Sequence, residues 1–543
     1  MNFSNLLFSI LLASTMSATY SYAKNLTTTE KLADFQQLNL IIESSYAPLK
    51  YKEQTQNILV NELKNTYAQK IEKTQTNFEF YQEMIKYVSE YHDGHFGVTV
   101  PSDYRSDIAI NTDLVNGKAL IGDIDRAKLS ETDFPFAKGD EVISIDQQPV
   151  LNIIADLSLR LGSGYSLSEQ RTAAQILFSR SGRRFFVPTG IAEIQIRRGT
   201  SNIIETVKLP WKVSGESFDE KKWGRLSPLM KKQNATSYDM LSIREDVTQL
   251  LGHEKMERSY RCSGDTRIAI PAGATILFKK PFVAYYHSTP KGNIGYLRIP
   301  HYSWDDVKID GITYTPDSVF KIYEFAIQQL EKNTVGLIID QDHNCGGSVG
   351  FLENMASLFM TEPFTPLQFE LLATKKEYFR FKSWMTGALE NTIEYQNMKS
   401  VLDLIKATWE AGQTLTTKIS IFGNDKIAPN HIHYTKPIVM LIDELSGSGG
   451  DAFPALLGGF GRVTLLGTRT SGLGGHIEEP EPLSFSGLNL RITKSLFYRP
   501  DGVAVENNGA VPHVPYSITR DDYIYEYKDY QKFYLMTLLN LIK

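Results

Sequence analysis

Apolar residues between Thr28 and His92 recur at helical spacing. In the last part of this stretch the apolar side chains share one helical face: Phe78, Tyr81, Ile85 and Val88. Thr76, followed three residues later by Glu79, has the pattern of a capping box at a helix start. The pattern predicts a small helical cap or a dimerisation element, and periodicity does not separate these two uses.

From Ile108 to Trp211 the pattern is typical of β-strands, and Asn116-Gly117 is a hairpin signal between two such runs. Residues 212–280 are polar, with lysines in two places and few regular periods. We interpret them as an insertion or linker that contains some strands.

After Gly292 the pattern becomes α/β. It predicts a strand at Gly295–Ile299, a helix at Val319–Leu330 and a buried strand at Thr334–Asp340. A further apolar run ends at Ile442 and leads into a stretch of small residues, after which the pattern is helical through Leu456: Ser446-Gly447-Ser448-Gly449-Gly450-Asp451.

This last strand, sharp turn and helix together carry a serine. Gly447 and Gly449 allow close backbone turns, and Asp451 is expected to cap the helix. The arrangement resembles a nucleophile elbow, although the sequence is not Gly-x-Ser-x-Gly. An isolated run of this kind is more often an ordinary turn, so the hypothesis requires a base and donors for an oxyanion elsewhere in the chain.

Candidates for both parts are present. Gly346 and Gly347 follow a buried strand and precede a helix that begins near Val349, so their N–H groups are expected to face a cleft. A phosphate-binding loop is the alternative, but the Gly-Lys-Ser/Thr that it needs is absent. His92 and His95 lie where a helix meets a loop, and either one matters only if it meets the serine.

The composition excludes several classes of protein. The 543 residues are 42% hydrophobic, which is enough for several cores, since single cores rarely exceed about 250 to 300 residues. The net charge is −5 without a long basic tract, so we expect no nucleic-acid partner. Cys262 and Cys345 are too few for a zinc site; they could form one bridge, but the sequence does not show that they do.

The N-terminus has the features of an export signal. An apolar stretch from Leu6 to Leu12 is too short to span a membrane, and Ser21 and Ala23 fit cleavage after Ala23. The first residues carry no Lys or Arg, which is unusual for such a signal, and a buried or disordered N-terminal helix is the alternative.

The run from Lys138 to Val150 resembles the Gly-Asp-x-Ile-x-x-Ile-Asn-Gly signature of PDZ domains, with Asp146-Gln147 in place of Asn-Gly. Such domains accept peptide C-termini by strand addition. Two pairs of possible metal ligands, His431-x-His433 and His476-x-Glu478, are more typical of a surface strand than of a metal site. We expect neither a metal nor a cofactor.

Several motifs occur in a characteristic order: Asp93-Gly94-His95, the PDZ-like run, Gly295-Tyr296-Leu297, the glycine loop from Asp340 to Gly347, Ser446 to Asp451, Leu466-Gly467-Thr468-Arg469-Thr470-Ser471-Gly472, and Val505-Glu506-Asn507-Asn508-Gly509-Ala510-Val511-Pro512. Together they resemble the C-terminal processing, or tail-specific, serine peptidases, intermittently from about residue 93 to 515. The resemblance implies a crotonase-like (ClpP-type) α/β catalytic domain beside the PDZ-like domain and the N-terminal helical region.

In this family the nucleophile precedes two small residues and an acidic one, which implies Ser448, with Ser446 the runner-up. The Ser-Lys branch has its lysine where this chain has Leu473, and leucine cannot accept a proton. The tricorn-like branch uses a histidine and a downstream glutamate, which implies His95 and, less directly, Glu506. The implied oxyanion donors are the N–H of Gly449 and one from Gly346 or Gly347.

These inferences divide the chain as follows: signal peptide 1–23, helical region 24–92, histidine loop and PDZ-like domain 93–211, insertion 212–280, catalytic domain 281–520 and C-terminal helix 521–543. The leading hypothesis is a secreted or periplasmic serine endopeptidase that acts on polypeptides. A catalytically weak or inactive peptide- or lipid-binding protein, or a hydrolase of non-peptide esters, shares the same scaffold. The sequence does not indicate the oligomeric state.

Overall fold

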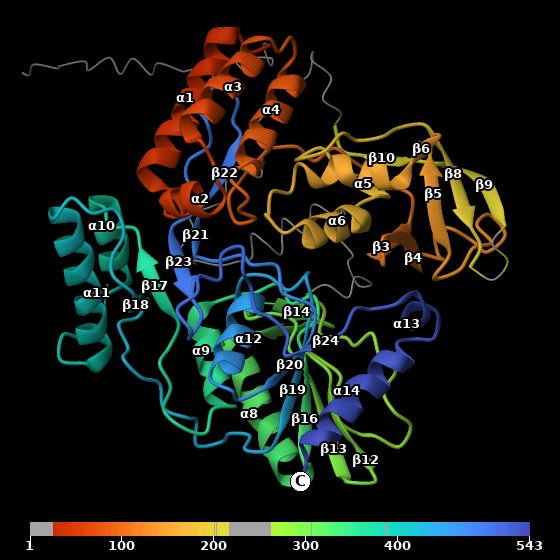
Figure 1. Cartoon of the computed structure of the whole chain (residues 1–543), viewed down its shortest axis with the longest axis vertical. Coiled ribbons are helices and arrows are strands. Elements are labelled where there is room, and N and C mark those ends of the chain that lie inside the picture. Colours follow the sequence, from red (N-terminus) through yellow and green to blue (C-terminus); the bar gives the residue numbers. More distant parts are fainter. Residues whose placement is uncertain are drawn as a thin grey trace, which may run out of the picture.

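A computed structural model of the chain describes residues 25–199, 201, 203–216, 262–305, 307–385, 387 and 389–543 (Figure 1). The predicted signal peptide and most of the 212–280 segment lie outside the described residues. Three parts of the molecule are distinguishable: a helical unit at one end, a β-rich domain beside it, and a larger α/β domain that contains the C-terminus.

Four helices form the N-terminal unit: α1 (Thr28–Ser45), α2 (Leu49–Thr55), α3 (Val60–Glu72) and α4 (Asn77–Ser89). The capping box of Thr76 and Glu79 is confirmed at the start of α4. The helices share a core with strands β1 (Gly97–Thr99) and β22 (Asn489–Thr493), which pair in antiparallel fashion. The chain just after His95 is therefore joined to a segment almost 400 residues further on.

The β-rich domain has an antiparallel sheet in the order β3-β4-β5-β8-β9: β3 (Ile110–Val115), β4 (Lys118–Ile124), β5 (Glu141–Ile145), β8 (Ile191–Arg197) and β9 (Ile204–Pro210). Helices α5 (Val150–Ser158) and α6 (Ser166–Gln175) cover it. The hairpin predicted at Asn116-Gly117 is confirmed, with φ of 49° and 73°. Asp146 and Gln147 also have positive φ, 49° and 66°, so they form the tight turn that Asn-Gly usually makes.

The α/β domain has a seven-stranded sheet in the order β11-β12-β13-β16-β19-β20-β24. Its strands are β11 (Thr275–Phe278), β12 (Ala284–Thr289), β13 (Gly292–Arg298), β16 (Gly336–Asp340), β19 (Ile438–Ile442), β20 (Thr464–Gly467) and β24 (Val514–Pro515). The strands from β13 to β24 are parallel. Their carboxyl ends therefore meet at one edge, where loops are free to build a site.

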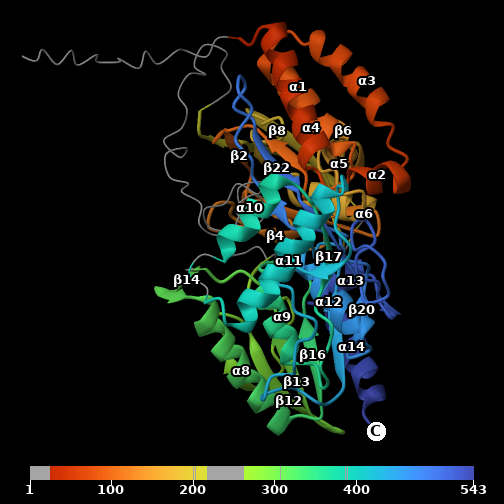
Figure 2. The same ribbon diagram turned by 90° about the vertical axis from the view of Figure 1, so that its left-hand side faces the viewer.

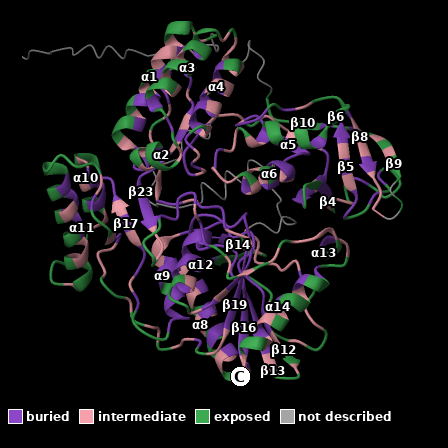
Figure 3. Ribbon diagram, in the orientation of Figure 1, coloured by how far each residue is buried: buried purple, intermediate pink, exposed green. Residues whose placement is uncertain are grey.

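Alternate residues of the central strands enter two different cores, because successive side chains of a strand point to opposite faces. Leu337, Ile339 and Met440 pack under α8 (Pro316–Asn333), α9 (Val349–Ser357) and α12 (Gly449–Gly459). Ile338, Val439 and Leu441 pack under α14 (Lys528–Leu541), as Figure 3 shows by the buried central strands. Val115 and Leu120 of the β-rich domain join the second core, which binds the two domains together.

A helical pair, α10 (Lys375–Trp384) and α11 (Ile393–Glu410), lies on the side of the α/β domain that Figure 2 turns toward the viewer. It is anchored by a small sheet of β18 (Ile419–Ser420), β17 (Gln368–Leu371) and β23 (Ser495–Tyr498). Within the part of the chain that the structure describes, no helix combines the length and the apolar character needed to cross a membrane.

Candidate active site

Ser448 lies in a strained turn between strand β19 and helix α12. Its backbone has φ 60° and ψ −114°, outside the regions that non-glycine residues usually adopt. Ser448 is the N-cap of α12, and its N–H donates to Asp451 Oδ2 at 2.6 Å. Asp451 does cap the helix, but from its third position: its carboxylate accepts the Ser448 N–H as part of a capping box.

Ser446, the runner-up, has a structural role in this arrangement. Its Oγ is fully buried and lies 2.9 Å from both the Gln341 carbonyl oxygen and Asp443 Oδ1. These contacts tie the turn to the end of the neighbouring strand β16. Ser448, at 5% exposure, is the serine placed at the start of the helix.

The three predicted oxyanion glycines lie together. A Cβ atom at Gly449 would stand 3.0 Å from the Gly347 nitrogen and 3.1 Å from the Gly346 Cα. The N–H of Gly346 already donates to Asn344 Oδ1 at 2.7 Å. Among the described residues, the N–H groups of Gly347 and Gly449 have no protein acceptor. Gly347 and Gly449 are therefore the pair available to an oxyanion.

A disulfide joins Cys345, in the same glycine loop, to Cys262, with a Cα–Cα distance of 5.3 Å. The Cys262 N–H also donates to the His343 carbonyl at 3.3 Å. The sequence left this pairing open. It attaches the loop that carries Gly346 and Gly347 to a segment 83 positions earlier in the chain.

Asp93 shapes the loop that carries His95. Its Oδ1 accepts the N–H of His95 at 2.8 Å and that of Phe96 at 3.2 Å. Its Oδ2 accepts the hydroxyls of Tyr46 and Thr493, at 2.9 and 2.8 Å. Asp93 thus fixes the backbone of the loop to helix α1's end and to strand β22, and it holds His95 in place.

The His95 side chain is fully buried. Neither ring nitrogen has a well-aligned hydrogen bond to the described residues, so the imidazole is not bonded to Ser448 here. Burial lowers the pKa of His95 to about 4, although Asp93 and the Gly475 backbone favour the protonated form. The histidine is therefore neutral at physiological pH and able to accept a proton.

Glu506 contacts Lys52 of helix α2 in a buried ion pair, and its Oε2 accepts the Gly474 N–H at 2.8 Å. Burial and the nearby Asp93 raise the pKa of Glu506, and Lys52 opposes this rise. Lys52 also donates to Asn507 Oδ1 at 2.6 Å. No hydrogen bond joins Glu506 to His95 within the described ranges, so its assignment stays a prediction.

Lys52 was not singled out from the sequence. It lies in a short helix with other charged residues, and nothing in the local pattern distinguishes a buried lysine from an exposed one. Its Nζ also donates to the His92 carbonyl at 2.7 Å, so His92 contributes its backbone to this cluster.

His476 is engaged in a separate buried group. Its Nδ1 lies 2.7 Å from Ser495 Oγ and its Nε2 lies 2.6 Å from an Arg380 nitrogen, while Glu478 pairs with Lys494 at 3.1 Å. The described residues contain no cluster of three or more histidine, cysteine or acidic side chains able to hold a metal.

Arg171 of helix α6 connects the β-rich domain to the loops at the strand ends. It forms two bonds to Asp113, at 2.8 and 2.9 Å. It also lies 3.2 Å from Asp443 and 3.1 Å from Glu444, which precede the Ser448 turn. His343, in the glycine loop, lies 3.3 Å from the same guanidinium and 2.8 Å from Asp443. The sequence offered no signal for this hub, because its members are far apart along the chain.

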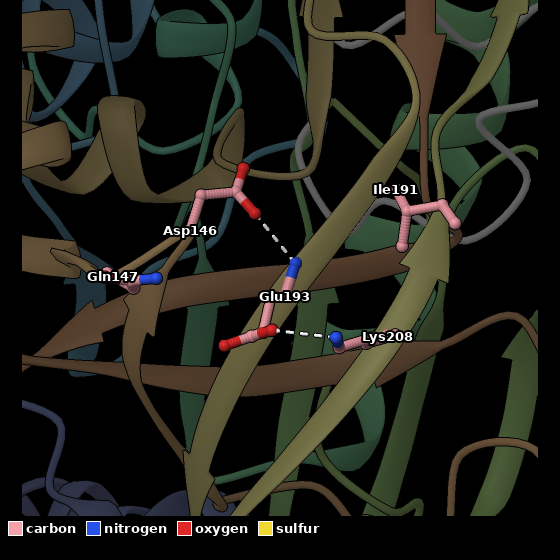
Figure 4. A pocket seen from close by; sticks show the side chains of 5 residues that line it. All are labelled: Asp146, Gln147, Ile191, Glu193 and Lys208. Carbon is pink, nitrogen blue, oxygen red and sulfur yellow. Dashed lines mark hydrogen bonds and ion pairs between the residues drawn. The ribbon is translucent and has the colours of Figure 1, made fainter.

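An open pocket lies on the β-rich domain, on strands β8 and β9 and the turn after β5, outside this site (Figure 4). Its polar groups pair with one another: Asp146 Oδ1 accepts the Glu193 N–H at 2.8 Å, and Lys208 lies 3.1 Å from Glu193. It contains no serine, cysteine or histidine, and so no nucleophile of the kind found at Ser448.

The site combines a serine on a strained strand-to-helix turn, two backbone N–H groups beside it without an acceptor in the described parts of the chain, and a buried neutral histidine on a nearby loop. This is the set of groups used by serine hydrolases that form an acyl-enzyme.

Comparison with known proteins agrees with this class. Residues 293–516 match peptidase family S41, and residues 108–222 match the PDZ domain. A protein of Chlamydia pneumoniae is 28% identical over 590 aligned positions, covering 95% of this chain and 90% of the relative. One of Chlamydia trachomatis is 27% identical and covers 94% of this chain and 93% of its own.

Two solved structures are similar over nearly the whole length. A serine-to-alanine mutant of CPAF has 25% identity and a TM-score of 0.81, and covers 95% of this chain and 98% of its own. Mature CPAF complexed with lactacystin also has 25% identity, with a TM-score of 0.78, and covers 95% of this chain and 99% of its own.

Residues 293–516 are therefore a peptidase S41 domain and residues 108–222 a PDZ domain, and the chain is a serine peptidase. The predicted multidomain α/β fold with a PDZ-like domain is confirmed.

Proposed function

We propose that the protein is a serine endopeptidase that cleaves polypeptides through an acyl-enzyme on Ser448, with His95 as general base. The observation that carries the proposal is the backbone of Ser448, held in a strained conformation beside the unbonded N–H groups of Gly347 and Gly449. Strain of this kind persists where the surrounding structure enforces it, and it is concentrated at active sites.

In the proposed reaction Ser448 Oγ attacks the carbonyl carbon of the scissile peptide bond. His95 takes the hydroxyl proton and later donates it to the leaving amine. The carbonyl oxygen, now negatively charged, accepts hydrogen bonds from the N–H groups of Gly347 and Gly449. A water molecule, deprotonated by His95, then releases the acyl group and regenerates the serine.

His95 has to come within hydrogen-bond reach of Ser448 when substrate binds, and such bonds are often loose before that step. Glu506 supports this arrangement through the Gly474 N–H that it accepts, since the next residue, Gly475, contacts the imidazole. A direct bond from Glu506 to His95, as in the tricorn-like branch, is not formed among the described residues, where Glu506 contacts Lys52 and Gly474.

Labelling with a fluorophosphonate, followed by mapping of the modified peptide, tests the nucleophile. We expect the adduct on Ser448, and we expect Ser448→Ala to abolish both labelling and cleavage of dye-labelled casein while the protein still folds. Ser446→Ala is the matched control and should still be labelled on Ser448. The loss of the Ser446 hydrogen bonds should lower the free energy of unfolding by about 1–3 kcal/mol. An adduct on Ser446 would overturn the assignment.

We also propose that the protein acts in the periplasm or outside the cell, after cleavage following Ala23. The disulfide between Cys262 and Cys345 supports this location, because disulfides persist in oxidising compartments. Terminal sequencing of protein from an export-competent host should find Lys24 first; retention of Met1 would contradict the proposal.

A further inference from the structure

Leu473 lies between the two loops that carry the proposed base and nucleophile. Its Cδ2 stands 2.6 Å from the position that a Cβ at Gly94 would take, and its Cδ1 stands 2.8 Å from the Cβ position at Gly447. Gly94 directly precedes His95, and Gly447 directly precedes Ser448. One aliphatic side chain thus contacts both loops at the residue before each reacting group.

Neither of these two glycines has a positive φ, so their backbone angles do not explain the absence of a side chain. A methyl group at either position would meet the end of the Leu473 side chain, which would have to shift; at Gly94 it would also lie 3.3 Å from Ser163 Cβ. At Gly447 the other nearby atom is Ser471 Oγ, at an ordinary distance of 3.7 Å, so Leu473 is the side chain that a methyl group would meet.

The backbone of Leu473 is held by the same carboxylate that holds the nucleophile. Asp451 accepts the N–H of Gly472 at 2.7 Å, that of Leu473 at 2.9 Å and that of Ser448 at 2.6 Å. Further along the segment, Gly475 contacts the His95 ring. The backbone of Leu473 is therefore held to the Ser448 turn, and its side chain reaches the His95 loop from there.

We propose that Leu473 is a positioning residue, which sets the spacing between the His95 loop and the Ser448 turn by packing against Gly94 and Gly447. A leucine side chain transfers no proton, so in this proposal Leu473 acts through the two loops. The proposal rests on the proposed function of Ser448 and His95.

The kinetics of fluorophosphonate labelling measure this role directly, because saturation separates the rate of acylation, kinact, from binding, KI. We expect Leu473→Ala to lower kinact at least about tenfold and to change KI less than about threefold, since small misplacements of reacting groups affect chemistry more than binding. Leu473→Met, which conserves volume, should retain most of the activity.

A double-mutant cycle with Gly447→Ala sharpens the test. Alone, Gly447→Ala should lower kinact at least about tenfold, whereas in the Leu473→Ala background the added methyl group should cost less than about threefold. Leu535→Ala, a truncation of a half-buried leucine on helix α14, is the control and should leave kinact unchanged. Thermal unfolding of each variant identifies those that lose activity by losing the fold.

Equal costs of Gly447→Ala with and without Leu473, or a normal kinact for Leu473→Ala, would overturn the proposal. The proposed function fails in a different way: Ser448→Ala or His95→Gln would then retain activity. If both of these abolish labelling while the cycle is additive, only the role of Leu473 is wrong.

Discussion

At the scale of single residues, the proposed site contains buried polar groups that lack hydrogen-bond partners. His95 is buried without a well-aligned hydrogen bond, and the N–H groups of Gly347 and Gly449 have no acceptor in the described parts of the chain. Buried polar groups of this kind are costly unless something pairs with them. A substrate carbonyl and the Ser448 hydroxyl supply the missing partners in the proposed reaction.

The pH dependence of cleavage follows from the burial of His95. A general base works when it is neutral, and burial lowers the pKa of His95 from 6.5 to about 4. kcat/KM should therefore be near its plateau at pH 6.5 and should fall only as the pH approaches the lowered pKa of about 4. The measurement is kcat/KM for a fluorogenic peptide between pH 4 and 9.

His95→Gln should lower kcat/KM by at least about a thousandfold, because members of a catalytic unit act together. His92→Gln is the matched control and should leave most activity, since His92 contributes its backbone carbonyl. Near-normal turnover of His95→Gln with an unchanged pH profile would show that another group is the base.

At the scale of elements, the site forms where strand β19, helix α12 and the segment after strand β20 come together. Asp451 joins all three, because its carboxylate accepts N–H groups from the turn before α12 and from residues 472 and 473. Glu506 performs the same task at Gly474. Two buried carboxylates thus hold the backbone of this glycine-rich segment.

Asp451→Asn tests this link. The amide has one oxygen in place of two and directs an NH2 group toward backbone N–H donors, so at least one donor is left without a partner. We expect the free energy of unfolding to fall by about 1–3 kcal/mol, and labelling of Ser448 to slow at least about tenfold. Chemical denaturation and labelling kinetics measure the two effects. Asp501→Asn, at an exposed loop position, should change neither, and wild-type labelling of Asp451→Asn would contradict the assignment.

At the scale of the whole molecule, the PDZ domain and the peptidase domain share both an apolar core and a charged hub. Val115 and Leu120 pack with residues of the central sheet, and Arg171 contacts Asp113 in its own domain and Asp443 in the other. Arg171 of the PDZ domain thus contacts Asp443, which precedes the Ser448 turn, and His343 in the glycine loop. Both loops of the site are therefore connected to the PDZ domain.

Arg171→Met should be strongly destabilising. It removes the guanidinium and leaves Asp113, Asp443 and Glu444 buried without their cation, which typically costs about 3–5 kcal/mol. Urea denaturation measures the loss. Arg160→Met removes an ion pair with the exposed Asp156 and a hydrogen bond to Gln82; it should cost less than Arg171→Met, because it leaves no buried charge without a partner. Equal losses in the free energy of unfolding for the two variants would show that the contacts of Arg171 with both domains do not stabilise the protein.

The sequence by itself determined features that depend on neighbours along the chain. The capping box at Thr76, the hairpin at Asn116-Gly117 and the strand, turn and helix around Ser448 are set by local preferences and by the spacing of apolar residues. The order of the motifs indicated the family, and Leu473 excluded a lysine base at that position.

Only the tertiary structure decided how distant groups pair. It showed that the Gly346 N–H is bonded to Asn344 while that of Gly347 has no acceptor among the described residues. It also showed that Glu506 lies against Lys52 and that Cys262 and Cys345 are joined. These facts could not be predicted from spacing, because each depends on which loops the folded sheet brings to one edge. The same reason applies to Arg171 and Leu473, whose contacts are made across loops and domains that the sequence keeps far apart.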